Sequence, residues 1–276
     1  MLKKLLSFFL FSILALSCQA EIRIQNNELL AFAGDSVITA GCSKRQYTGF
    51  RYLVTETLQK NGIRCKVIVS GRSKESSGAL LKRLPQAVIA KKPAWLILST
   101  GFNEALGKNA SLADFKKNVT SILDLAKKNN IKVILMTTPA YGENLSAPKN
   151  KLLLPYNEFL RQEAGKRALP LADVYKGFET ELAKKELANI PQNKLSLYGT
   201  SFNGRAHFVM AEAILKAMGF SKEKAALARK EWEEKYPAAR IYLNINFSRF
   251  KACGKAGARK NMNVKEYVAD CVKKVK

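Results

Sequence analysis

Short apolar runs recur along the chain, and each ends in glycine, proline or small polar residues that are typical of turns. Within most of these runs, apolar residues occupy successive positions rather than alternate ones. This pattern predicts strands of a parallel sheet that helices cover on both faces. The predicted strands lie at 29–36, 64–71, 94–101 and 131–139, with a weaker fifth at 169–175.

Between and after the apolar runs, hydrophobic residues recur at the spacing of a helix. In one of these segments Ser111 and Asp114 form a capping box at the start, and Gly219 ends the last segment. The alternation of strands and helices predicts an α/β fold, a doubly wound parallel sheet with right-handed crossovers. Ligands of such sheets bind beyond the carboxyl ends of the strands. The clearest predicted helices cover residues 49–62, 111–130 and about 205–218.

Residues 1–20 have the pattern of a secretory signal peptide. Two lysines precede residues 5–16, which are nearly all apolar, and a small-residue cleavage site ends at Ala20. The apolar run is too short to span a membrane comfortably, so no transmembrane span is expected. We therefore expect export to the periplasm or the extracellular space. The alternative is a lipoprotein signal in which Cys18 is the lipidated residue.

The chain has 276 residues and a formal net charge of +25. This length suits one α/β domain, predicted at 21–219, with a smaller C-terminal part at 220–276. That part begins with a charged helix at 221–235 and continues as a basic extension. The charge favours anionic partners such as acidic polysaccharides, cell-envelope polymers or lipid headgroups. Export argues against nucleic acid, and the alternative is that the charge serves only solubility.

Four cysteines remain beyond the signal segment, and an even number in an exported protein suggests up to two disulfides. The alternative is buried free thiols. The sequence contains no CxxC pair and only one histidine, so we expect neither a metal site nor a cofactor. The candidate pairs are Cys42–Cys65 and Cys253–Cys271.

Three residues with chemical potential follow successive predicted strands. Ser36 follows the first strand, where a strand-to-helix turn exposes a hydroxyl beside free backbone N–H groups and suits a nucleophile. Gly71 ends the second strand, and a glycine lets a backbone N–H approach a ligand closely. Asn103 follows the third strand, and its side-chain amide can donate to a developing oxyanion. Taken singly, they are a helix cap, a turn glycine and a loop asparagine.

Taken together and in this order, these residues and the helix HFVMAEAILKAMG resemble the GDSL (SGNH) hydrolase family of esterases and lipases. The resemblance covers roughly residues 28–219 and implies a flavodoxin-like, three-layer α/β/α fold. It implies Ser36 as the nucleophile, with the N–H groups of Ser36 and Gly71 and the side chain of Asn103 as the oxyanion hole. Implied substrates are esters of sugars, lipids or small acyl groups. The family's third block usually reads Gly-x-Asn-Asp, where this chain has Glu104.

The family's fourth block, Asp-x-x-His-Pro-Asn, is replaced in this chain. With Asn203 and Met210 fixing the alignment, the histidine position falls on Ser201 and the aspartate position on Tyr198. The catalytic base and its orienting carboxylate are therefore both missing. His207 is the weaker candidate for a base, because it lies on an apolar helical stripe that is typical of core residues.

Two functions are consistent with this sequence. The first is an exported ester hydrolase that acts on acylated carbohydrate or similar esters, with impaired or unconventional catalysis. A serine without a base is a poor nucleophile, and losing a general base costs about 10² to 10⁴ in rate. The second is a non-catalytic homologue, a pseudoenzyme, that binds acidic glycans.

Overall fold

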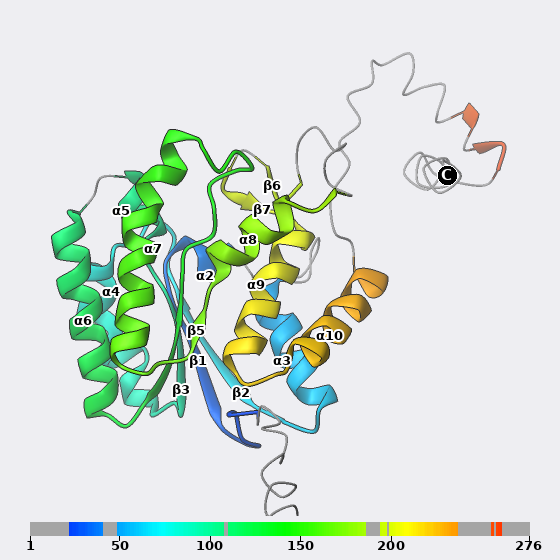
Figure 1. Cartoon of the computed structure of the whole chain (residues 1–276). Helices are drawn as coiled ribbons and strands as arrows, with labels where there is room; N and C mark the ends of the chain where they lie inside the picture. The colour runs from blue at the N-terminus through cyan, green and yellow to red at the C-terminus, as the bar shows by residue number, and fades with distance from the viewer. Residues whose placement is uncertain are drawn as a thin grey trace, which may run out of the picture. The chain divides into compact units, whose positions relative to one another are not determined.

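A computed structural model describes most of the chain (Figure 1). It divides into two compact units, Met1–Ala239 and Arg240–Lys276, and the account below concerns the first. None of the described helices is both long and apolar enough to cross a membrane. The described residues are 22–40, 49–107, 110–185, 194–197, 199–236, 255–256 and 258–260.

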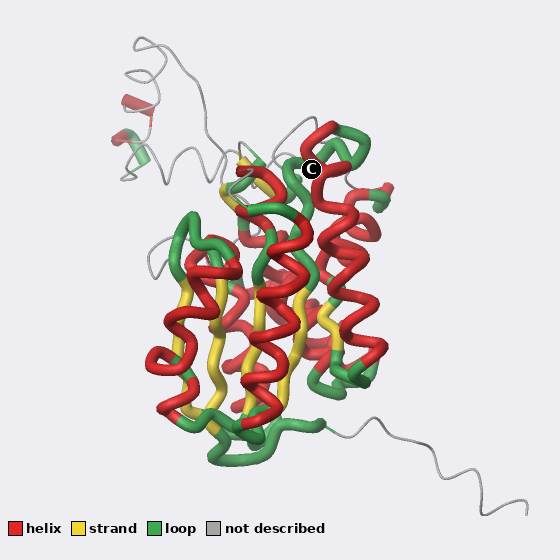
Figure 2. The backbone as a smooth tube through the Cα atoms, turned by 90° about the vertical axis from the view of Figure 1, so that its left-hand side faces the viewer, coloured by secondary structure: helices red, strands yellow, loops and turns green. Residues whose placement is uncertain are grey.

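Five parallel strands form the central sheet in the order β2-β1-β3-β4-β5. Figure 2 shows these strands side by side between the flanking helices. The predicted parallel five-stranded sheet is therefore confirmed, although its fifth strand has only two residues. The strands are β1 (Leu29–Gly34), β2 (Lys66–Gly71), β3 (Trp95–Ser99), β4 (Lys132–Met136) and β5 (Leu171–Ala172).

The edge strand β2 differs from the other long strands in its burial. Residues of β1 and β3 are almost completely buried, as expected for strands inside an α/β sandwich. In β2, by contrast, the side chains of Val67 and Val69 are 39% and 47% exposed. The expectation that helices cover every strand on both faces is wrong for β2, because Val67 and Val69 lie on the same face of the strand and the described residues leave both exposed.

Helices cover the two faces of the sheet in separate groups. The helices α4, α6 and α7 lie on one face, and α3, α9 and α10 lie on the other (Figure 1). This is the three-layer arrangement that right-handed crossovers produce. Their bounds are α2 Ser36–Ala40, α3 Phe50–Lys60, α4 Ser77–Ala87, α5 Phe102–Gly107, α6 Leu112–Lys128, α7 Pro148–Lys166, α8 Val174–Leu182, α9 Gly204–Ala217 and α10 Lys222–Lys235.

The helix α6 shows how local sequence fixes an element. The Ser111 side chain accepts a hydrogen bond from the backbone of Asp114, and the Asp114 carboxylate accepts one from the backbone of Ser111. This reciprocal cap was predicted and is confirmed. The predicted apolar face is buried as well, and it consists of Phe115, Val119, Ile122 and Ala126.

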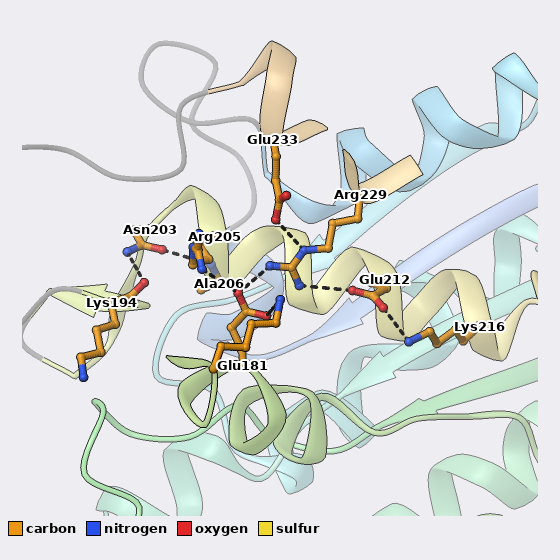
Figure 3. Close-up of polar contacts among 10 residues, drawn as sticks. Glu181, Lys194, Asn203, Arg205, Ala206, Glu212, Lys216, Arg229 and Glu233 are labelled. Carbon is orange, nitrogen blue, oxygen red and sulfur yellow. Dashed lines mark hydrogen bonds and ion pairs between the residues drawn. The ribbon is translucent and has the colours of Figure 1, made fainter. Parts of the chain in front are cut away.

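The charged helix α10 packs on α9 through a small apolar contact and a network of ion pairs. The buried ring of Trp232 lies 6.2 Å from the ring of Phe208 on α9. The Arg229 guanidinium donates to three carboxylates, which come from α8, α9 and α10 itself (Figure 3). These carboxylates belong to Glu181, Glu212 and Glu233.

Cys65, the residue just before β2, has a free thiol. Its sulfur lies 3.9 Å from the carbonyl oxygen of Gln25, and burial raises the pKa of the thiol. The structure therefore does not contain the Cys42–Cys65 disulfide that we considered, while Cys42 itself lies outside the described residues. Cys253 and Cys271 also lie outside them.

Candidate active site

The turn after β1 places Ser36 at the first position of α2. Gly34 ends the strand with φ +148°, and a Cβ there would lie 1.7 Å from the carbonyl oxygen of Ser99. Only glycine fits this approach of β1 to β3. Asp35 is buried, and its carboxylate accepts hydrogen bonds from the N–H groups of Val37 and Phe102 at 2.9 and 3.2 Å. Gly34 and Asp35 thus fix the backbone conformation of the Gly-Asp-Ser turn, and Ser36 carries the candidate nucleophilic hydroxyl.

The hydroxyl of Ser36 has two hydrogen-bond partners in the described part of the chain. It donates to Oδ1 of Asn103 at 3.0 Å and accepts from the backbone N–H of Lys74 at 2.9 Å. The other end of the Asn103 amide donates from Nδ2 to the carbonyl oxygen of Glu75 at 3.1 Å. Two of the predicted site residues, Ser36 and Asn103, therefore touch each other. An amide oxygen is not a base, so this contact orients the serine proton without removing it.

Gly71 lies opposite Gly34 in the sheet and directly against α2. A Cβ on Gly71 would lie 2.7 Å from Cγ2 of Ile38, so the missing side chain allows β2 and α2 to pack. The N–H of Lys66 donates to the carbonyl of Glu28, the residue before β1, and the N–H of Arg72 donates to the carbonyl of Gly34, the last residue of β1. Because strand residues alternate in direction, the N–H of Gly71 points away from β1.

The N–H that reaches Ser36 belongs to Lys74, a residue that sequence reasoning missed. Lys74 lies in the loop between β2 and α4 and has φ +60°, the left-handed region that a non-glycine residue adopts at a cost. No sequence signal marks it, because a backbone N–H is common to every residue except proline.

Glu104 stands where the family pattern has aspartate, and it points to α4. Its Oε1 accepts from the N–H of Ser77 at 2.6 Å, while its buried Oε2 has no hydrogen-bond partner among the described residues. Burial, together with the nearby Glu104 carboxylate, raises the pKa of Asp35 to about 7, although the N–H of Val37 acts in the opposite direction. The buried Asp35 carboxyl group thus supports the backbone of the serine turn, while that of Glu104 binds the first residue of α4.

The segment that replaces the fourth block forms a short hairpin, β6 (Ser196–Leu197) with β7 (Ser201–Phe202). Ser201 is exposed, and Tyr198 lies outside the described residues. Asn203, which follows the hairpin, accepts from the N–H of Ala206 at 3.0 Å and caps α9. The asparagine of the block therefore keeps a structural role.

His207 lies in the interface between α9 and α3. It is 2% exposed, and its ring stacks on Phe50 at 5.9 Å between centroids. Its buried Nδ1 has no hydrogen-bond partner in the part of the chain that the structure describes. Burial lowers the pKa of His207 to about 4, and the charge of Arg51 adds to this effect. The imidazole is therefore neutral near pH 7, and no carboxylate among the described residues orients it.

A cavity of about 520 Å³ lies between α8, α9 and α10, away from these residues. None of Ser36, Gly71 and Asn103 lines it. Its wall carries Arg229 and the carboxylates of Glu181 and Glu212, which are already paired with one another. We therefore place the candidate active site at the serine turn, where chemical groups converge, rather than at this cavity.

A parallel sheet with a serine at the turn after β1, and an asparagine from the end of the neighbouring strand β3 beside it, is an α/β hydrolase-like fold. Residues 32–193 match the sequence model described as the GDSL-like Lipase/Acylhydrolase family. The match covers more than half of the chain, and the protein belongs to this family.

Two relatives are esterases. An acetylxylan esterase of Geobacillus stearothermophilus is 26% identical over 221 residues, which cover 72% of this chain and 97% of the relative. The esterase TesA of Pseudomonas aeruginosa is 26% identical over 161 residues, which cover 53% of this chain and 78% of the relative.

Solved structures share the fold. The crystal structure of the Geobacillus acetylxylan esterase superimposes with a TM-score of 0.62 at 22% identity, covering 72% of this chain and 98% of that one. An α/β hydrolase from the metagenome of Lake Arreo gives a TM-score of 0.62 at 20% identity, with the same coverage. Catalytic mutants solved for the Geobacillus enzyme replace a serine, an aspartate and a histidine three positions after the aspartate.

Proposed function

We propose that this protein is an exported serine ester hydrolase that acts slowly on acylated carbohydrate or similar esters. The observation that carries the proposal is the Ser36 hydroxyl at the start of α2, held between the Asn103 amide and a backbone N–H. The acetylxylan esterase activity named for the Geobacillus relative supports an acylated sugar as substrate. The protein's net charge of +25 favours esters carried on an anionic polymer.

In the proposed reaction, Oγ of Ser36 forms a bond with the ester carbonyl carbon, and the alcohol leaves with a proton. Water then hydrolyses the acyl-enzyme and releases the acid. The N–H of Ser36 and the amide of Asn103 are the proposed oxyanion donors, and the N–H of Gly71, which points away from β1, would have to turn toward the serine to join them. For Asn103 to donate, its Nδ2 has to exchange the Glu75 carbonyl for the oxyanion.

The serine proton has no conventional acceptor in this proposal. Ser201 and Tyr198 replace the family's histidine and aspartate, and water or an unconventional base takes their place. We expect turnover to be lower than that of a complete triad by about 10² to 10⁴, with residual catalysis coming from the oxyanion donors.

The second candidate is a non-catalytic homologue that binds acidic glycans. One observation favours it, because the Ser36 O–H donates to an amide oxygen, which cannot accept a proton in catalysis. His207 does not offset this loss in the present arrangement, since its imidazole is buried against Phe50.

Purified mature protein and a Ser36→Ala variant, assayed on short-chain aryl esters and on acetylated polysaccharide, distinguish the two candidates. Hydrolysis that disappears in the variant supports the esterase. Equal, background-level rates for both proteins support the binding protein, and retention on a polyuronate column then tests the ligand class.

A double variant, Ser201→His with Tyr198→Asp, tests the alignment of the fourth block. Hydrolysis should appear or rise if these positions face Ser36, because the variant restores a base and its orienting carboxylate. A double variant that folds and remains at the parent rate would show that the two positions do not reach the serine.

Export is part of the same proposal. The mass of the mature protein recovered from the producing cell should correspond to a chain that begins at Glu21. A lipid-modified chain that begins at Cys18 is the other outcome we consider, and it would place the protein at a membrane surface.

A further inference from the structure

The loop of residues 72–76, between β2 and α4, is tied to the serine turn at several points. The N–H of Arg72 donates to the carbonyl of Gly34 at 3.0 Å, and the hydroxyls of Thr39 and Ser73 lie 3.2 Å apart. The N–H of Lys74 donates to Oγ of Ser36. The loop therefore forms one wall of the site, and its position sets the distance of the Lys74 N–H from the nucleophile.

One side chain of α4 forms hydrogen bonds both to the end of β2 and to the last part of this loop. Nε of Arg83 donates to the Glu75 carboxylate at 2.6 Å, and its Nη2 also pairs with that carboxylate. The same Nη2 donates to the carbonyl oxygen of Ser70 at 2.8 Å, while Nη1 bonds the Ser70 hydroxyl. The two charged side chains are only 13% and 5% exposed. We call Arg83 and Glu75 the loop clamp.

The clamp reaches Ser36 by two routes. Glu75 follows Lys74 in the chain, so fixing Glu75 fixes the peptide group whose N–H donates to the serine. The carbonyl of Glu75 also accepts from Nδ2 of Asn103, whose Oδ1 accepts a hydrogen bond from the Ser36 hydroxyl. Both partners of the Ser36 hydroxyl therefore depend on where Glu75 lies.

Such a clamp is needed because Lys74 adopts a costly backbone conformation. A non-glycine residue in the left-handed region costs about 1–2 kcal/mol, and such residues persist only where their surroundings over-determine them. A bidentate guanidinium–carboxylate pair supplies strong and directional bonds. Removing one partner would leave the other charge buried and unpaired, which is strongly destabilising locally.

We propose that the N–H of Lys74 is a catalytic donor to Ser36 and that Arg83 and Glu75 are the positioning residues that aim it. The inference rests on the proposed esterase function. As Oγ attacks, its O–H bond breaks, the proton passes to water, and negative charge passes from Oγ to the carbonyl oxygen. The Lys74 N–H, 2.9 Å from Oγ, stabilises the negative charge that Oγ carries while its proton leaves and before the charge reaches the carbonyl oxygen, and this contribution is larger where the usual base is absent.

Labelling by a fluorophosphonate tests the clamp in the full-length mature protein. Oγ of Ser36 bonds to phosphorus and fluoride leaves, so intact mass reports the reaction and Ser36→Ala gives the background. We expect Arg83→Met to lower the maximal labelling rate by about 10- to 100-fold, since complete loss of one fixed donor to a developing negative charge costs about 10² to 10³ and the variant only misplaces the donor. The probe concentration at half-saturation should stay the same, because the clamp does not contact the probe.

The matched control is Arg167→Met, which removes another arginine with charged partners, because Arg167 bonds the carboxylates of Glu163 and Asp124 just beyond the end of α7. It should label within twofold of the parent. Arg83→Lys and Glu75→Gln keep one hydrogen bond each, so we expect smaller losses from them, and they carry the test if Arg83→Met does not fold.

The possible failures are distinguishable. A parent protein that labels no faster than Ser36→Ala refutes the esterase proposal, and the inference falls with it. A parent that labels while all three clamp variants keep its rate refutes the inference alone. A clamp variant that raises the half-saturating concentration at an unchanged maximal rate also refutes it, because that would assign the clamp to binding rather than positioning.

Discussion

Replacing Arg229 with methionine should loosen the attachment of α10 to the rest of the domain. The guanidinium donates to Glu181 at 2.6 Å, to Glu233 at 2.8 Å and to Glu212 at 3.2 Å. The Glu181 side chain is only 2% exposed, so removing Arg229 leaves a buried charge with fewer partners.

The expected cost follows from what Glu181 retains. Breaking a buried ion pair costs about 3–5 kcal/mol when the remaining charge has no other partner. Glu181 keeps its pairs with Arg205 and Lys184, at 3.1 and 3.0 Å. We therefore expect a smaller loss in the free energy of unfolding, about 2–3 kcal/mol. At about 2–4 °C per kcal/mol for a domain of this size, the melting temperature should fall by roughly 5–10 °C.

The pH dependence gives the same prediction an independent test. Burial raises the pKa of Glu181, but the bonds from Arg229 and Lys184 outweigh it, and the net pKa is lower than the ordinary 4.5. A lowered carboxylate pKa contributes stability above about pH 4.5 that is lost as the pH falls further. Arg229→Met should therefore lose less stability on acidification than the parent.

Thermal and urea denaturation of the parent and the variant measure this effect. Lys60→Met is the control, since it removes an exposed pair with Glu231 and should change stability by less than about 1 kcal/mol. An Arg229→Met protein that melts with the parent, at neutral pH and at pH 4, would refute the view that the network holds α10 in place.

Three further predictions concern the site. Gly71→Ala places a methyl 2.7 Å from Ile38, so it should cost about 1–3 kcal/mol by thermal denaturation, while Gly165→Ala, with open space around it, should not destabilise. Because Asp35 holds a proton up to about pH 7 when folded, stability should fall by up to about 1.4 kcal/mol per unit as the pH rises from about 4 to 7. Asp35→Asn should flatten that slope in urea titrations. His207→Gln should keep the fluorophosphonate labelling rate of the parent, and a loss of labelling in a folded variant would make His207 the base.

The sequence predicts the central sheet well, because successive apolar positions arise where a strand is buried on both faces. It fails for the edge strand β2, whose successive apolar residues 67–69 predict burial although Val67 and Val69 are exposed. Position in the sheet depends on which strands neighbour one another, and a single run contains no information on that. The hairpin of β6 and β7 is missed for a different reason, since its strands have two residues each and show no periodicity.

The sequence likewise predicts one part of the candidate site and not the other. Ser36 and Asn103 meet because the carboxyl ends of parallel strands lie at one edge of a sheet, which the strand pattern already implies. Lys74 could not be predicted, because its contribution comes from the backbone and from a conformation that its side chain disfavours. Arg83 resembles any other charged residue on an amphipathic helix until the fold brings it to Glu75.

The open side of β2 has a consequence for handling the protein. An edge strand with exposed valines that pairs on one side only among the described strands can recruit the same strand of another molecule, which leads to self-association at high concentration. A charged side chain on such a strand discourages that pairing without disturbing the interior. Val69→Lys should therefore give a preparation that stays monodisperse in light scattering at concentrations where the parent forms larger particles.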